Sequence, residues 1–106
     1  MTMFDDTLLF STTIFTPHAA EREDFLRAQS ERLPLFGNIP GWHGTRFFAE
    51  ERGRRFLLLS SFTDAQAQDD FAATPAFQAH RATLLPMLEG VDSQHWRLVL
   101  ARDPGS

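Results

Sequence analysis

The segment Ser60–Gly90 narrows the choice of fold more than any other part of the chain. It begins at the end of an apolar strand, and Thr63 or Asp64 then offers the side-chain oxygen that typically caps a helix. The helix that follows is short and is expected to end near Ala73. A strand and a helix therefore follow one another here with almost no loop between them.

A second helix in this segment has a clear start and a clear end. Thr74 is a capping residue, and Pro75 suits the first helical position, where an N–H group would have no partner within the helix. The helix is expected to run to about Leu85, where Pro86 and then Gly90 stop it.

Four segments are rich in the apolar, β-branched and aromatic residues that are typical of strands. They are Thr7–Phe15, Trp42–Glu50, Arg54–Phe62 and Gln94–Leu100. The second and third are expected to form a hairpin, because Glu51–Gly53 is a short turn in which the glycine allows a positive φ.

A further helix is expected between the first two strands. Thr16 would cap it, Pro17 would be its first residue and Pro34 would end it. The elements then follow the order β-α-β-β-α-β. This order predicts an α+β, ferredoxin-like fold in which a four-stranded antiparallel sheet carries the helices on one face.

Apolar residues occupy both faces of the predicted strands, although a lone sheet with one solvated face would alternate apolar and polar residues. The residues expected to lack a covering helix are Leu9, Phe15, Phe47, Leu57, Leu59 and Val99. A second copy of the chain is the simplest cover for that face. The pattern therefore predicts a homodimer through the open sheet face, which is a dimeric α+β barrel.

Length and charge limit the possible partners. The 106 residues suit a single domain, with a core over about 7–100 and a tail at 101–106. The formal net charge of −4 argues against nucleic acid, which needs a basic surface to neutralise phosphates. No apolar run approaches the roughly 20 residues that span a bilayer, and the first residues lack the positive charge of a signal peptide. We therefore expect a cytoplasmic protein with neither a nucleic-acid nor a membrane partner.

Several cofactor signatures are missing from the sequence. Cysteine is absent, which excludes disulfides, thiol catalysis and cysteine-based metal sites. The four histidines show neither HxH nor HxxxH spacing, and there is no glycine-rich phosphate loop. We therefore expect neither a metal ion nor an organic cofactor.

The order of elements coincides with a set of short motifs. These are Pro40-Gly41-Trp42 before the second strand, the strand Phe56–Phe62, and the spaced residues Phe71, Thr74-Pro75-Ala76-Phe77, His80-Arg81, Leu84 and Leu88-Glu89-Gly90. Together they resemble the antibiotic biosynthesis monooxygenase family of the dimeric α+β barrel superfamily. The resemblance covers roughly Thr7 to Leu100.

This resemblance implies a small cofactor-independent monooxygenase whose substrates are an aromatic or quinone-type molecule and O₂. In such members of the family the substrate loses a proton and reacts directly with oxygen. They carry an arginine on the second helix, which Arg81 matches, and an asparagine and a tryptophan on the third strand. Leu58 and Phe62 stand at those two positions here.

Two alternatives stay open. The first is a non-catalytic ligand-binding or scaffold protein of the same fold, which the replacement of the asparagine and tryptophan favours. The second is a heme-binding or heme-degrading oxygenase, because His80 lies near the axial histidine of that branch of the family. Phe71 replaces that branch's tryptophan, and the first strand offers no asparagine, so the heme alternative is disfavoured.

The candidate catalytic residues are Arg81, His80 and Arg46, with His80 as base and Arg81 as the partner of an oxyanion. The candidate substrate-binding residues are Trp42, Phe48, Phe62, Phe71 and Phe77. Alternation along the second strand places Arg46, Phe48 and Trp42 together under the helices. Each has a structural alternative: His80 at a boundary, the arginines in solvent, and the aromatic rings as ordinary core.

Overall fold

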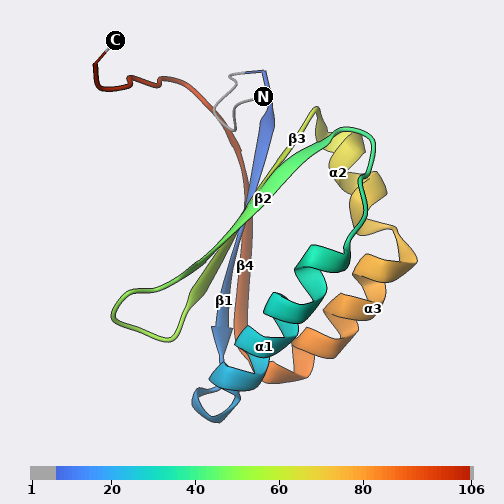
Figure 1. Ribbon diagram of the computed structural model, residues 1–106, viewed down its shortest axis with the longest axis vertical. Coiled ribbons are helices and arrows are strands. Elements are labelled where there is room, and N and C mark those ends of the chain that lie inside the picture. Colours follow the sequence, from blue (N-terminus) through green and yellow to red (C-terminus); the bar gives the residue numbers. More distant parts are fainter. Residues whose placement is uncertain (1–6, 106) are drawn as a thin grey trace.

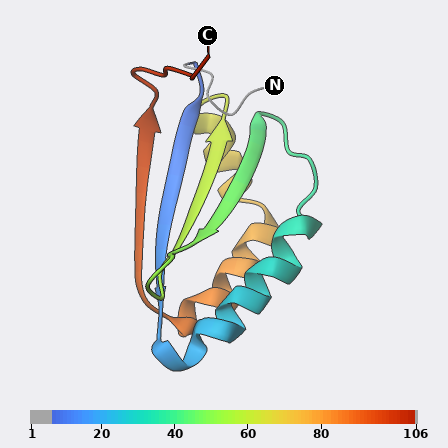
Figure 2. The same cartoon turned by 60° about the vertical axis from the view of Figure 1, so that its left-hand side comes forward.

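A computed structural model describes residues 7–105. It contains one antiparallel sheet with the strand order β2-β3-β1-β4 (Figure 1). The strands are β1 (Leu9–Pro17), β2 (Trp42–Ala49), β3 (Phe56–Phe62) and β4 (Leu88–Arg97), and the helices are α1 (Arg22–Arg32), α2 (Ala65–Ala72) and α3 (Pro75–Leu84). All three helices lie on one face of the sheet (Figure 2). The predicted ferredoxin-like α+β fold is confirmed.

The apolar core lies between α1, α3 and the sheet. Phe25 of α1 is fully buried, and its ring centroid lies 5.1 Å from that of Phe15 and 5.3 Å from that of Phe56. Leu84 of α3 completes this cluster. Burying one such side chain contributes about 1.5–3 kcal/mol, so the cluster holds both helices against the sheet.

The two helices that follow β3, α2 and α3, begin where the sequence predicts. The Asp64 carboxylate accepts a hydrogen bond from the Ala67 N–H at 2.9 Å and caps α2. The Thr74 hydroxyl accepts from the Phe77 N–H at 3.3 Å and caps α3, in which Pro75 is the first residue. Both caps satisfy N–H groups that have no partner within the helix.

The predicted start of the first helix is wrong. Thr16 and Pro17 belong to β1, where they pair with Gly90 and Leu88 of β4. A 3-10 turn, Ala19–Glu21, follows, and α1 begins only at Arg22 without a side-chain cap. Strand pairing between distant segments therefore extends the strand through a dipeptide whose local preference is to begin a helix.

The fourth strand lies earlier in the sequence than predicted. It spans Leu88–Arg97 instead of Gln94–Leu100, and Gly90 is part of it instead of stopping a helix. The sequence does not indicate a strand here, because β4 is an edge strand whose side chains are mostly exposed and many of them polar. Val99 lies beyond the strand and is 95% exposed.

A β-bulge in β2 changes which residues face the helices. The register shifts between Trp42 and Gly44, whose φ of 136° is one that L-residues rarely adopt. Beyond the bulge, Thr45 and Phe47 face the helices, whereas Arg46 and Phe48 face the open side. The predicted position of Arg46 and Phe48 under the helices is therefore wrong.

The open face of the sheet carries a different set of apolar residues from the predicted one. Leu9, Phe15 and Phe47 lie on the helix side, as their cross-strand partners show. Leu57 and Leu59 do lie on the open side, opposite Ile14 and Thr12. Two large aromatic side chains accompany them there, because Phe48 is 47% exposed and Trp96 54% exposed.

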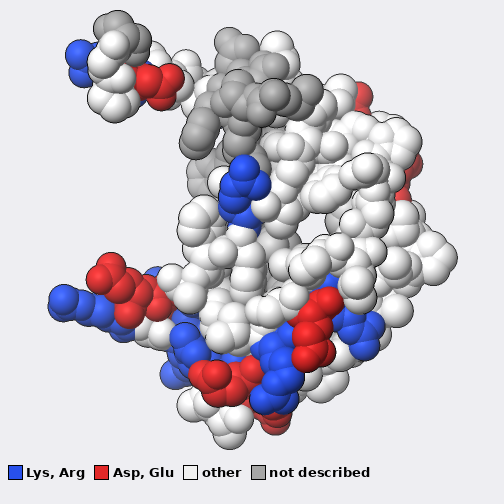
Figure 3. Space-filling model, in the orientation of Figure 1, with Lys and Arg blue, Asp and Glu red and all other residues white. Residues whose placement is uncertain are grey.

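Charged side chains gather at the end of the molecule that holds the start of α1 and the β2–β3 hairpin (Figure 3). Arg55 pairs with Glu50 at 2.7 Å across the hairpin, and Arg54 pairs with Glu89. A hollow bordered by uncharged side chains opens between the sheet and the helical layer (Figure 3). Within the described residues, no helix is long and apolar enough to cross a membrane.

Candidate functional site

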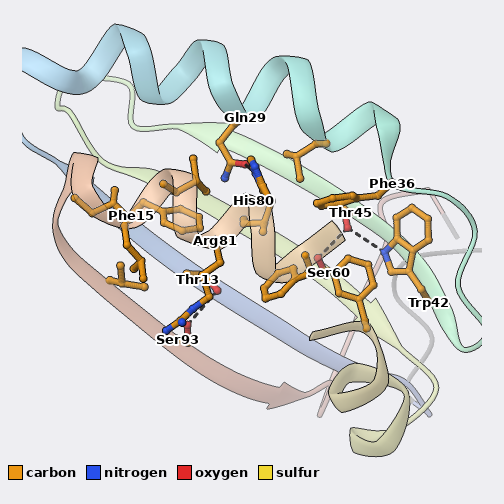
Figure 4. A pocket seen from close by; sticks show the side chains of 18 residues that line it. Thr13, Phe15, Gln29, Phe36, Trp42, Thr45, Ser60, His80, Arg81 and Ser93 are labelled. Atoms are coloured by element: carbon orange, nitrogen blue, oxygen red, sulfur yellow. Dashed lines mark hydrogen bonds between the residues drawn. The ribbon is translucent and has the colours of Figure 1, made fainter. Parts of the chain in front are cut away.

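A cavity of about 220 Å³ lies between the sheet and the helices α1 and α3 (Figure 4). Its walls come from every strand and from all three helices, together with the loop after α1. The lining residues are Thr13, Phe15, Gln29, Leu33, Phe36, Trp42, Thr45, Leu58, Ser60, Phe71, Phe77, His80, Arg81, Leu84, Leu85, Leu88, Val91 and Ser93. The cavity is thus mainly apolar with a few polar groups, as is typical of small-molecule sites.

Aromatic rings form one end of the cavity. Phe71 of α2 lies at their centre, with ring-centroid distances of 5.5 Å to Phe77, 5.9 Å to Phe36 and 6.2 Å to Trp42. The contacts with Phe77 and Phe36 are edge-to-face, and the contact with Trp42 is tilted. Aromatic pairs prefer such offset and edge-to-face arrangements, which suit a flat apolar ligand equally well.

Hydroxyl groups form part of the cavity floor on the sheet. The Trp42 indole N–H donates to the Thr45 hydroxyl at 3.0 Å, and that hydroxyl lies 2.8 Å from the Ser60 hydroxyl. Further along, the Thr13 and Ser93 hydroxyls are 3.2 Å apart. The sheet therefore brings two pairs of hydroxyl groups to the cavity, among apolar residues such as Leu58 and Val91.

His80 lies on the wall that α3 contributes, and it is only 4% exposed. Its Nε2 is 2.5 Å from Oε1 of Gln29 on α1, and its ring contacts Phe36 edge-on at 5.5 Å. Burial lowers the pKa of His80, and the positive charge of Arg32 lowers it further. His80 is therefore neutral at pH 7, and among the described residues its buried Nδ1 has no hydrogen-bond partner.

Arg81 brings a positive charge to the cavity. Its side chain extends from α3 toward the Thr13–Ser93 pair (Figure 4). Within residues 7–105 it makes no hydrogen bond and no ion pair, although its guanidinium group carries five N–H donors. An anionic group in the cavity would therefore find an unengaged cation on this wall.

The structure brings together five of the eight sequence-predicted site residues. His80, Arg81, Trp42, Phe71 and Phe77 all line the cavity. The other three, Phe62, Phe48 and Arg46, lie elsewhere.

Phe62 packs behind Phe71, with ring centroids 5.7 Å apart, and does not line the cavity. Phe48 and Arg46 lie on the opposite face of the sheet because of the bulge in β2. There Arg46 donates a hydrogen bond to the Thr45 carbonyl at 3.1 Å, and Phe48 borders a shallow surface hollow with Ile14 and Leu57.

Sequence reasoning missed Gln29, Phe36 and the hydroxyl pair of Thr45 and Ser60. Gln29 does leave a signal, because it is a polar residue within the apolar stripe of a helix. Phe36 leaves none, since it lies in the loop after α1 and reaches the cavity only through the tertiary fold. Among the described residues, no group of three His, Cys, Asp or Glu side chains is placed to hold a metal ion.

Comparison with a family model agrees with the sequence motifs. The model described as antibiotic biosynthesis monooxygenase matches residues 11–83, a segment that begins within β1 and ends near the end of α3. No curated protein matches the sequence significantly.

Solved structures show the same fold at low sequence identity. A candidate antibiotic biosynthesis monooxygenase from Nitrosomonas europaea is 13% identical, with a TM-score of 0.78 over 91% of this chain and 94% of its own. One from Bordetella bronchiseptica is 18% identical, with a TM-score of 0.76 over 89% and 99%. A conserved protein from Methanosarcina mazei is 12% identical, with a TM-score of 0.78 over 91% and 98%.

Proposed function

This chain belongs to the antibiotic biosynthesis monooxygenase family, and we propose that it is a cofactor-independent monooxygenase acting on a small aromatic molecule in the cavity beneath α1 and α3. One observation carries the proposal. A buried, neutral histidine and an arginine without a polar partner among residues 7–105 share the wall of an aromatic cavity. A base, a cation and an apolar enclosure are what the proposed reaction needs from a protein.

The proposed reaction begins with a proton transfer. His80 accepts a proton from an acidic C–H or O–H group of the ring system, and Arg81 stabilises the resulting anion. The electron-rich anion then reacts with O₂. For a substrate with a ring CH₂ group, one oxygen atom becomes the new carbonyl and the other leaves in water, so the substrate supplies all the electrons.

The chain departs from its oxygenase relatives on β3, and the cavity floor offers a substitute. Leu58 and Phe62 stand where those relatives carry asparagine and tryptophan, and neither can donate a hydrogen bond. The hydroxyls of Thr45 and Ser60 supply polar groups on the same part of the sheet. We propose that they take over contacts to the oxygen atoms of the substrate.

A second copy of the chain is the proposed cover for the open face of the sheet. Phe48 and Trp96 lie there half exposed, beside Ile14, Leu57 and Leu59. A soluble monomer rarely exposes an apolar patch of this kind, and pairing two such faces buries both.

The function is tested by aerobic turnover of a panel of anthrones, naphthols and hydroquinones, with chelator present and no added cofactor. We expect quinone absorbance above the protein-free background. We expect Arg81→Ala to lower the rate by about 100-fold, the lower end of the range that loss of one such electrostatic contact produces. Arg46→Ala is the matched control and should keep the wild-type rate, because Arg46 lies on the other face. Equal rates in both variants would refute the role of Arg81.

A ligand-binding role without turnover is the second candidate function. The apolar residues Leu58 and Phe62 on β3 favour it, because they remove two polar groups from the site. It predicts that panel compounds bind, and quench the fluorescence of Trp42, without being oxidised in air. Oxidation that depends on Arg81 would eliminate this candidate.

A further inference from the structure

Gln29 is buried where a helix usually places an apolar residue. It lies one turn after Phe25 on α1, and it is 1% exposed. A side-chain amide has a carbonyl oxygen that accepts hydrogen bonds and an NH₂ group that donates two. The carbonyl Oε1 lies 2.5 Å from Nε2 of His80 on α3, so this contact uses only one end of the amide.

The NH₂ end of Gln29 faces the cavity. Within residues 7–105 its nitrogen makes no hydrogen bond. It still has accessible surface, because the partnerless polar atoms that are fully enclosed in this part of the chain are Ser61 Oγ, Gln68 Oε1 and His80 Nδ1. Gln29 lines the cavity, and its amide nitrogen is turned away from His80 toward that space (Figure 4). Two N–H donors therefore meet the cavity without an acceptor from the described chain.

The opposite orientation of the amide is less favourable. A turned amide would donate to Nε2 of His80, so the imidazole would carry its proton on Nδ1, which is enclosed and has no partner within the described chain. Unpaired buried donors are rarer than unpaired buried acceptors. The observed orientation avoids such a donor, and it leaves the NH₂ group of Gln29 for a ligand.

The hydroxyl pair of Thr45 and Ser60 adds a further donor to the cavity. The Trp42 indole can only donate, so the Thr45 oxygen accepts its N–H. The two hydroxyls carry two protons, and the contact between them uses one. The other O–H group has no acceptor among the described residues, and both side chains line the cavity. No carboxylate is among the described lining residues, so donors dominate the polar lining.

We propose that Gln29 is a substrate-binding residue whose amide N–H donates to the carbonyl oxygen of an aromatic ketone bound in the cavity. The proposal deepens the proposed function by naming the group that is recognised, and it rests on that function only for the aromatic class of the ligand. A designed cavity of about 150 Å³ is known to hold benzene, and this one measures about 220 Å³, which suits a ketone of the size of 1-indanone.

A neutral donor at this position distinguishes ligands by their oxygen atom. A hydrocarbon of the same shape would leave the amide N–H groups without a partner, which is unfavourable in a buried site. A ketone accepts one of them without bringing a charge into the cavity. In the proposed reaction the loss of a proton places negative charge on this oxygen, and the same hydrogen bond becomes charge-assisted and stronger. Gln29 thus stabilises the anion together with Arg81.

The affinities of 1-indanone and indane test this preference, measured by isothermal titration calorimetry on the full chain in the absence of O₂. We expect the wild type to bind the ketone more tightly than the hydrocarbon. Gln29→Leu should reduce the ratio of the two affinities by about three- to tenfold, the effect of losing one neutral hydrogen bond. Taking the ratio cancels changes in packing that affect both ligands alike. An unchanged ratio, or a wild type that does not bind the ketone, would overturn the proposal.

Gln68→Leu is the matched control. Gln68 also donates a hydrogen bond from a helix, to the Ser11 hydroxyl at 3.0 Å, but it does not line the cavity. The control should keep the wild-type ratio of affinities. A reduction of the same size in both variants would reflect a general effect on the fold and would overturn the role of Gln29.

The hydrogen bond can also be detected without a variant. The ¹³C resonance of a labelled 1-indanone carbonyl moves downfield when the oxygen accepts a hydrogen bond. We expect the bound resonance to lie downfield of its position in a hydrocarbon solvent, and Gln29→Leu to move it back. A bound resonance at the hydrocarbon position would overturn the proposal. A downfield resonance that Gln29→Leu leaves in place would also overturn it, by assigning the oxygen to another donor such as Ser60.

These binding results are separate from turnover. A panel that shows no oxidation in air removes the monooxygenase, whereas an affinity ratio that does not depend on Gln29 removes only the recognition of the carbonyl group.

Discussion

The burial of His80 makes the stability of this protein depend on pH. Burial and Arg32 lower the pKa of His80 in the folded state below its ordinary value of about 6.5. In the unfolded state the same histidine therefore binds a proton more readily. The contribution of neutral His80 to stability is fully present above about pH 6.5 and is lost as the pH falls toward the folded-state pKa.

We predict that His80→Phe removes this part of the pH dependence. Urea unfolding at pH 7.5 and pH 5.5 should show a larger loss of unfolding free energy on acidification in the wild type than in the variant. His43→Phe is the control, because His43 is half exposed and bonds to the Thr63 hydroxyl at 2.8 Å. A wild type and a His80→Phe variant that lose the same free energy would contradict the prediction.

Residues of the site differ in how far the sequence reveals them. His80 and Arg81 could be named because they are polar residues on a helix that is otherwise apolar along one face. Arg46 and Phe48 could not be placed, since simple alternation holds only for a strand without a bulge, and the bulge at Gly44 reverses the faces that follow. Which face each later residue of β2 points to thus depends on the one irregular position at Gly44.

At the scale of single elements, one side chain sets the boundary between α2 and α3. Thr74 caps α3 through its hydroxyl and also donates to the Phe71 carbonyl at 2.8 Å, so one side chain ends α2 and begins α3. We predict that Thr74→Ala lowers the unfolding free energy by about 1 kcal/mol, the usual effect of losing such a cap.

The matched control is Thr83→Ala on the same helix. Thr83 is exposed and bonds only to the carbonyl of Ala79 one turn earlier, at 3.2 Å. Alanine is the better helix former, so this change should be neutral or slightly stabilising. Both variants can be compared by urea unfolding monitored by circular dichroism. Equal destabilisation by the two changes would show that the Thr74 cap has no special role.

The elements also show why local signals fail at particular places. The caps Asp64 and Thr74 could be predicted because each acts on N–H groups within three residues. Thr16 and Pro17 form the same kind of dipeptide as Thr74 and Pro75, yet they extend β1. The difference lies in β4, more than 70 residues away, which supplies their partners Gly90 and Leu88. A Thr-Pro dipeptide therefore begins a helix only where no distant strand pairs with it.

At the scale of the whole molecule, the two faces of the sheet differ in what covers them. The helix side is closed by α1, α2 and α3 and holds the cavity (Figure 1). The open side presents Phe48 and Trp96 half exposed, although Trp96 does donate a hydrogen bond to the Thr12 hydroxyl at 2.6 Å. Among the described residues, none that lines the cavity comes from the open face, so association through that face would leave the cavity intact.

We predict that the protein is a dimer at micromolar concentration and that Phe48→Glu makes it a monomer. The charge would have to be buried in the interface without a partner, which is strongly unfavourable. Light scattering coupled to gel filtration should give twice the 12.1 kDa of one chain for the wild type and a single chain mass for the variant. Leu35→Glu is the control, because Leu35 is 78% exposed in the turn after α1, away from the open sheet face. This variant should remain a dimer. A monomeric wild type would refute the barrel, and dissociation by Leu35→Glu instead of Phe48→Glu would place the interface on the helical side.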